Sequence, residues 1–176
     1  MAITRLSGTN AISGTLPAAN INDTSISNIT ALPAGVGGKV LQVVNGSTSS
    51  QVGVTANNSA DTGLTATITP SAVSSKILII CNHGLFTKSA TQTYCSLALK
   101  RDSTTIYQIN NAFYSEESGG GQFRLPTQTM SFLDSPSTTS ATTYKTNIAC
   151  PAGSSGTIYS QYQSQQSTIQ LIEIGA

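Results

Sequence analysis

The chain has 176 residues, a net charge of +1 and only 9% charged side chains, whereas an average soluble domain carries about 25%. Its eight Lys and Arg residues are scattered, with one adjacent pair at Lys100-Arg101, so the basic patch of a nucleic-acid-binding protein is missing. No run of roughly 18 apolar residues occurs, so we expect no membrane insertion.

The first part of the chain, residues 1–38, is typical of an extended arm without a core of its own. Single apolar residues stand three to six positions apart among Ser, Thr, Asn and Gly, a spacing that fits neither an amphipathic helix nor an alternating strand. Such a segment buries too little apolar surface to offset its ordering entropy. We therefore expect the arm to become ordered on another molecule, through Ile3, Leu6, Ile12, Leu16, Ile21, Ile26 and Ile29.

Residues 39–58 are predicted to form a β-hairpin that serves as a neck. A strand at 39–44 is followed by Asn45-Gly46, which is a strong turn signal, and 51–55 supplies the returning strand. The head then comprises residues 59–176.

The head is a succession of short apolar or alternating segments, separated by clusters of Pro, Gly, Ser, Asn and Asp. Strands are predicted at 63–69, 76–81, 84–88, 93–100, 104–109, 128–133, 142–149, 157–162 and 167–174. No segment has the period and the caps of an amphipathic helix. Short strands at such regular spacing predict an all-β fold, namely an antiparallel jelly roll or β-sandwich.

Two of these strands are expected to be covered on both faces. The segment 76–81 is continuously apolar, which is typical of a central strand. In the last strand, Ile172 stands between Leu171 and Ile174, so apolar side chains fall on both faces. Contacts between subunits are the simplest way to cover the second face.

Metal and thiol chemistry is disfavoured by the small number of suitable ligands. Cysteines stand at 81, 95 and 150, and their odd number and wide spacing indicate buried free thiols. The single histidine, His83, lacks a fourth partner with which it and these thiols would complete a metal site. The alternative is a histidine at a strand end that hydrogen-bonds locally. We expect no metal site and no cofactor.

Catalysis is disfavoured by the scarcity of carboxylates. Glu116 and Glu117 are adjacent, so in a strand they would point to opposite faces and not across one scissile bond. The chain has neither a Gly-x-Ser-x-Gly elbow nor a phosphate-binding Gly-x-x-x-x-Gly-Lys loop. We expect no catalytic residues and no enzymatic activity.

The loop 110–124 is the longest break in the strand pattern, and it mixes aromatic, amide and charged residues. Loops on a rigid sandwich are where binding specificity is usually built. The predicted receptor-binding residues are Tyr114, Glu116, Glu117, Phe123 and Arg124. In the alternative interpretation, Phe113 and Phe123 tuck inward and the loop tip is simply solvated. The segments 135–141 and 161–166 are secondary candidates, interpreted as turns.

Four segments of the chain are similar to those of a known group of proteins. Thr67-Ile-Thr-Pro-Ser-Ala-Val-Ser-Ser-Lys-Ile-Leu-Ile-Ile80 and the closing Ser167-Thr-Ile-Gln-Leu-Ile-Glu-Ile-Gly-Ala176 resemble the heads of small fibre and appendage proteins of marine tailed phages, notably those infecting cyanobacteria. In the arm, Ala18-Ala-Asn-Ile-Asn-Asp-Thr24 and Gly38-Lys-Val-Leu-Gln-Val-Val44 resemble the virion-anchoring starts of such proteins. The resemblance implies a homotrimer whose jelly-roll head is similar in shape to tumour-necrosis-factor and complement C1q heads. It implies no catalytic residue.

The resemblance also implies a function, that of a virion structural protein. We expect a short tail fibre or appendage whose arm docks on another tail or capsid protein by strand addition or groove binding. The head would bind a host-surface glycan or protein, with three copies supplying avidity. Two alternatives stay open: a capsid decoration or head-fibre protein without a receptor role, and a free lectin-like module attached to no particle. A depolymerising enzyme is disfavoured by the few carboxylates.

Overall fold

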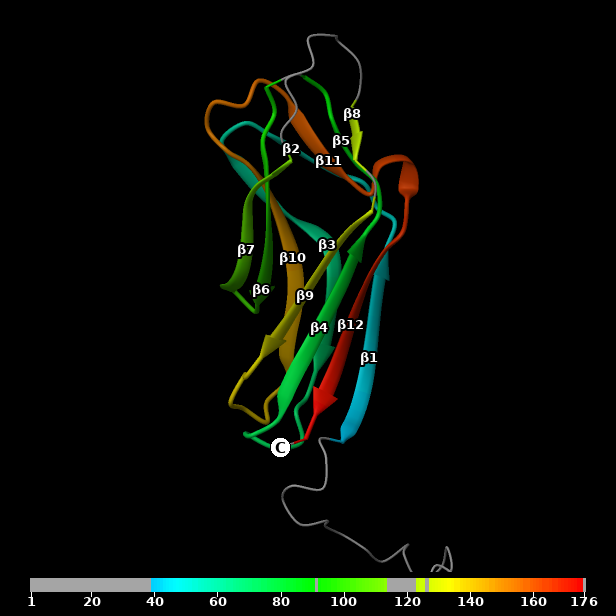
Figure 1. Ribbon diagram of the computed structural model, residues 1–176, viewed down its shortest axis with the longest axis vertical. Coiled ribbons are helices and arrows are strands. Elements are labelled where there is room, and N and C mark those ends of the chain that lie inside the picture. Colours follow the sequence, from blue (N-terminus) through cyan, green and yellow to red (C-terminus); the bar gives the residue numbers. More distant parts are fainter. Residues whose placement is uncertain (1–38, 91, 114–122, 126, 176) are drawn as a thin grey trace, which may run out of the picture. The chain divides into compact units, whose positions relative to one another are not determined.

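The computed structural model describes residues 39–90, 92–113, 123–125 and 127–175, which lie in the compact unit Gly38–Ala176 (Figure 1). The strands in these ranges are β1 (Val40–Thr48), β2 (Val52–Thr55), β3 (Asn58–Ile68), β4 (Lys76–His83), β5 (Phe86–Lys88), β6 (Cys95–Arg101), β7 (Thr104–Phe113), β8 (Phe123–Leu125), β9 (Gln128–Asp134), β10 (Thr142–Cys150), β11 (Thr157–Ser160) and β12 (Ser167–Ile174). A 3-10 turn, η2 (Tyr162–Ser164), precedes β12. The predicted arm and its anchoring residues lie outside the described residues.

Eight of the strands form two four-stranded antiparallel sheets. We call β1-β12-β4-β9 the first sheet and β3-β10-β6-β7 the second sheet. Strands that are equally far from the two ends of the strand order pair with each other: β1 with β12, β3 with β10, β4 with β9, and β6 with β7. A long antiparallel hairpin rolled into two layers has this order, which is that of a jelly roll. The predicted all-β sandwich is confirmed.

The four remaining strands form a small sheet, β2-β11-β5-β8, at one end of the sandwich (Figure 1). One of them, β5, follows β4 of the first sheet after a break at Gly84 and Leu85. Gly84 allows the chain to pass closely beside the residues before β12, since a Cβ on it would lie 2.6 Å from the backbone oxygen of Gln165.

The hairpin predicted within residues 39–58 is wrong. β1 pairs with β12 and β2 pairs with β11, so both strands belong to the sheets of the sandwich. The chain continues straight through Asn45-Gly46 instead of turning there. Gly46 is required by a close approach of β1 to β3, because a Cβ on it would lie 2.1 Å from the backbone oxygen of Thr65. Gly46, which was interpreted as part of a turn, therefore allows β1 to pack closely against β3 at one side of the sandwich.

The core lies between the inner faces of the two main sheets and extends under the small sheet. Along β4 and β12 the inward residues are buried, while the outward ones are only half-buried or exposed. The full cover predicted for both faces of these two central strands is therefore not provided within the described chain. The largest fully buried side chains are Leu64, Ile68, Ile77, Ile79, Phe86, Leu97, Leu99, Tyr144, Ile148, Ile158, Ile169 and Leu171.

The three cysteines are buried free thiols, as predicted. Burial raises the pKa of Cys81 and of Cys95 to about 12. Both thiols therefore stay protonated, and they act as small apolar side chains of the core.

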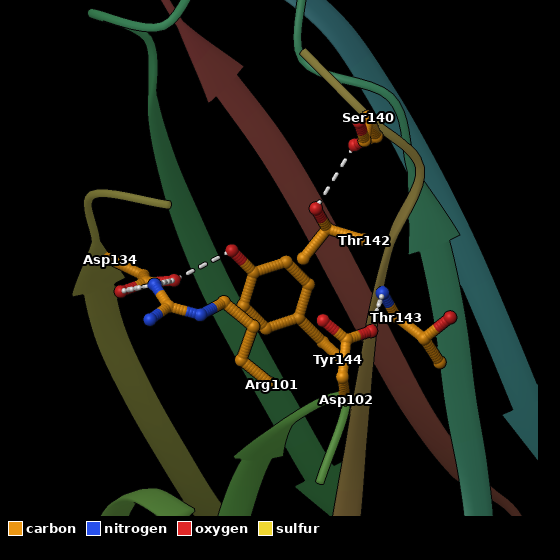
Figure 2. Close-up of polar contacts among 7 residues, drawn as sticks. All are labelled: Arg101, Asp102, Asp134, Ser140, Thr142, Thr143 and Tyr144. Atoms are coloured by element: carbon orange, nitrogen blue, oxygen red, sulfur yellow. Dashed lines mark hydrogen bonds and ion pairs between the residues drawn. The ribbon is translucent and has the colours of Figure 1, made fainter. Parts of the chain in front are cut away.

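A polar cluster ties the two main sheets together at the end of β9 (Figure 2). The Asp134 carboxylate of the first sheet accepts hydrogen bonds from Arg101 Nη1, at 3.0 and 2.9 Å, and from the Tyr144 hydroxyl, at 2.7 Å. Burial and the neighbouring Asp134 raise the pKa of the Tyr144 hydroxyl, so it remains a donor. Because Arg101 and Tyr144 belong to the second sheet, this carboxylate links the layers through charge-assisted bonds.

A second buried carboxylate, Glu173, fixes the loop after β3 to the first sheet. Glu173 accepts hydrogen bonds from the backbone N–H and the hydroxyl of Ser71, at 2.7 and 2.6 Å, and from Gln42 Nε2 at 2.6 Å. Burial raises the pKa of Glu173, but the hydrogen bonds from Ser71 and Gln42 outweigh burial and lower it to about 2. The side chain is thus ionised and fully paired although it is buried.

Replacing the inter-sheet carboxylate tests its contribution to stability. Asp134→Asn removes the charge that Arg101 faces, and we expect the free energy of unfolding to fall by about 2–3 kcal/mol in urea titrations. The control is Asp61→Asn, which breaks the partly exposed Asp61–Lys145 ion pair and should cost no more than about 1 kcal/mol. Equal losses in the two variants would contradict the role given to Asp134.

The low pKa of Glu173 predicts a specific acid sensitivity. Its folded pKa of about 2 lies below the ordinary 4.5, so its stabilisation is complete above pH 4.5 and is lost as the pH falls towards 2, by at most about 1.4 kcal/mol per pH unit. We expect Glu173→Gln to flatten the pH dependence of the unfolding free energy in this window. Ser71→Ala removes a hydrogen bond that lowers this pKa, so the loss should be smaller and should end at a higher pH. An acid profile unchanged by Glu173→Gln would show that the carboxylate is not coupled to folding.

Candidate functional site

One face of the small sheet gathers an aromatic and cationic row from four strands. In the register of this sheet, Gly53 of β2 lies opposite Tyr159 of β11, Tyr159 opposite Thr87 of β5, and Thr87 opposite Arg124 of β8. Residues directly opposite each other in neighbouring strands project from the same face. The row therefore starts at Gly53 and ends at Arg124, with Tyr159 and the buried Thr87 between them.

Gly53 leaves room for the neighbouring aromatic ring. A Cβ at position 53 would lie 2.8 Å from one ring carbon of Tyr159 and 2.9 Å from another. The Tyr159 ring thus lies directly against the backbone of β2, where any larger residue would displace it.

A second tyrosine completes the surface. Tyr162 opens η2, and its backbone N–H donates to the Leu85 carbonyl at 2.9 Å. Its ring centroid lies 6.1 Å from that of Tyr159 and 5.9 Å from the Arg124 guanidinium carbon. Both distances suit aromatic and cation–π contacts. We call Tyr159, Tyr162 and Arg124 the Tyr–Arg surface.

The turn that carries Tyr162 is held in an unusual backbone conformation. Gln161, Gln163 and Ser164 have φ values of 50°, 55° and 57°, in the left-handed region that non-glycine residues rarely adopt. The buried Gln161 side chain compensates by accepting from the Ser160 hydroxyl at 2.6 Å and donating to the Ser167 hydroxyl at 2.8 Å. This anchoring fixes where Tyr162 lies.

The side chains of the Tyr–Arg surface can bind a ligand by stacking and hydrogen bonding. Two half-buried phenol rings offer apolar faces and polar tips, the exposed Arg124 offers charged donors, and the exposed amides of Gln163 and Gln165 lie in or beside η2. Tyrosine and arginine dominate the binding energy of many interfaces. A glycan or a protein loop can be held here by ring stacking and hydrogen bonds.

The structure brings one predicted receptor-binding residue to this surface, namely Arg124. Phe123 lies in β8, and its side chain is outside what the structure describes, as are Tyr114, Glu116 and Glu117. Sequence reasoning missed Tyr159, which it placed only in a predicted strand, and it gave the segment 161–166 with Tyr162 only as a secondary candidate, interpreted as a turn. The available signal was the pair of tyrosines three residues apart beside a run of glutamines.

The histidine considered for metal binding lies at the end of β4 inside the fold. His83 is fully buried, its ring lies 5.4 Å from the Phe86 ring, and neither ring nitrogen has a hydrogen-bond partner within the described part of the chain. The local hydrogen bond offered as an alternative is therefore not found. Burial lowers the pKa of His83 to about 4. Among the described residues, no three His, Cys, Asp or Glu side chains are grouped so that they could hold a metal ion.

Comparison with known proteins yields distant structural similarity only. No family model and no curated protein matches the chain. Similar solved structures include the infectious bursal disease virus VP2 subviral particle, at 11% identity and a TM-score of 0.41 over 77% of this chain and 40% of that chain. The Gt strain of that virus is similar at 12% identity and a TM-score of 0.38, over 76% of this chain and 40% of that chain. The chain spans less than half the length of these viral chains, and at such TM-scores the similarity carries no argument about function.

The part of the chain that the structure describes contains no helix long and apolar enough to cross a membrane.

Proposed function

We propose that this chain is a virion structural protein, a short tail fibre or appendage whose head binds a host-surface glycan or protein. The observation that carries the receptor role is the Tyr–Arg surface, built across the small sheet and fixed by the hydrogen-bonded η2 turn. A rigid scaffold that presents aromatic rings and a guanidinium loses little conformational entropy on binding. The phage-fibre resemblance of the head segments supports the virion role.

The same proposal includes the arm and the subunits. Residues 1–38 dock on another tail or capsid protein, as their scattered apolar residues suggest, and three copies form the fibre. A shallow site binds weakly by itself, and three linked copies raise the overall affinity by avidity. Two alternatives remain: a capsid decoration protein without a receptor role, and a free lectin-like module. The experiments below distinguish the proposal from each of them.

Substitutions in the Tyr–Arg surface test the receptor role. We expect Tyr162→Ser and Arg124→Gln each to weaken binding of the labelled protein to cyanobacterial cells or to a glycan array at least tenfold, because each removes a central contact. Lys100→Gln removes a half-buried cation on the second sheet and should leave binding unchanged. If the wild-type protein binds neither cells nor glycans, it is a decoration protein without a receptor role.

Deletion of the arm tests anchoring. We expect a chain of residues 39–176 to fold and to keep the binding of the full chain, but to be missing from particles assembled in its presence. Incorporation of this shortened chain at the wild-type level, measured by immunoblot of purified particles, would show that the arm does not dock. The absence of the full chain from particles would instead favour the free module.

A further inference from the structure

The outward face of the first sheet carries a row of apolar residues across all four strands. Val43 of β1 lies opposite Ile172 of β12, Ile172 opposite Leu78 of β4, and Leu78 opposite Leu133 of β9. Their chain neighbours on the other side of the sheet belong to the core, so this row points away from it. Val43 is 52% exposed and Leu133 is 49% exposed.

The apolar area continues from this row to the start of β1. Val40 is 62% exposed and Leu41 is 45% exposed, and the half-buried Ile174 pairs with Val40. We define the outer apolar face by Val40, Leu41, Val43, Leu78, Leu133, Ile172 and Ile174. Contiguous apolar surfaces on a soluble chain mark interaction sites or aggregation liabilities.

The rim of this face is polar but almost uncharged. The next rows of the register are Asn45, Gln170, Ile80 and Ser131, and then Ser47, Thr168, Asn82 and Thr129. Among the described outward positions of the first sheet, only Lys76 is charged, and it lies at the end of the apolar rows, where the exposed Lys39 precedes β1.

A rim of this kind complements itself. Amides and hydroxyls both donate and accept hydrogen bonds, so copies of this face can meet around the three-fold axis of the proposed trimer without bringing like charges together. The Lys76 side chain lies at the margin, where its flexible stem can carry the ammonium group into water. With a net charge of +1, copies of the chain repel each other only weakly. A partner that recognised this face by charge would instead require charged residues around it.

We propose that the outer apolar face is covered by another copy of this chain. The inference rests on the self-association included in the proposed function, and it assigns the residues that make the contact. It leaves the Tyr–Arg surface, on the small sheet, open to a ligand in every copy.

Sedimentation equilibrium of the full chain tests this assignment. We expect the wild-type mass to be three times the 18.1 kDa chain mass at micromolar concentration. The double variant Val43→Glu with Leu133→Glu should sediment as a monomer, with the dissociation constant raised at least ~100-fold. Thr105→Glu with Ser59→Glu adds the same charges at exposed positions of the second sheet and should keep the wild-type mass.

Further measurements separate loss of contact from loss of folding. Circular dichroism and thermal melting should be alike in all variants. If the glutamate variant does not fold, Val43→Ala with Leu133→Ala replaces it, with an expected ~10-fold rise in the dissociation constant. An oligomer that persists unchanged in a folded variant would overturn this assignment and leave the proposed fibre trimer intact. A wild-type chain that is still a monomer at about 100 μM would overturn both the assigned contact and the proposed trimer.

Discussion

The carboxylate of Asp134 is the point at which the two main sheets are joined by charge. The hydrophobic effect that holds the sheets together is non-directional. The bonds from Arg101 and Tyr144 to one carboxylate are directional, and they fix the end of β9 against β6 and β10. Since the register of each antiparallel strand follows from that of its neighbour, a fixed point at one end constrains the rows across both sheets.

Those rows determine where the two candidate surfaces lie. The Tyr–Arg surface and the outer apolar face are each assembled from side chains on four strands that are remote in sequence. The first lies on the small sheet at one end of the sandwich, and the second reaches the start of β1 at the opposite end (Figure 1). This separation allows association through one surface while the other stays accessible, which is the arrangement that a multivalent binding protein needs.

The fold class could be predicted from the sequence because local alternation encodes strands. The last strand has the predicted bounds, and 76–81 was recognised as a central strand, although the strand runs on to His83. The hairpin at Asn45-Gly46 failed because the glycine serves a distant contact with β3, which no local pattern reveals. Tyr159 and Tyr162 were missed for a related reason, since their meeting with Arg124 depends on long-range register. The predicted roles of the arm and of the loop tip concern residues that the structure does not describe.

The position of β12 has a consequence for how the chain reaches its fold. This strand, the last in the described sequence, is inserted between β1 and β4 in the middle of the first sheet. During synthesis β1 and β4 therefore emerge before the strand that pairs with both of them. Their apolar inner faces stay partly uncovered until β12 has left the ribosome. Pairings of such long sequence separation form slowly, and open strand edges invite aggregation in the meantime. A ribosome that stalls before Ser167 would release a chain with a gap at the centre of a sheet, a natural substrate for chaperones and proteases.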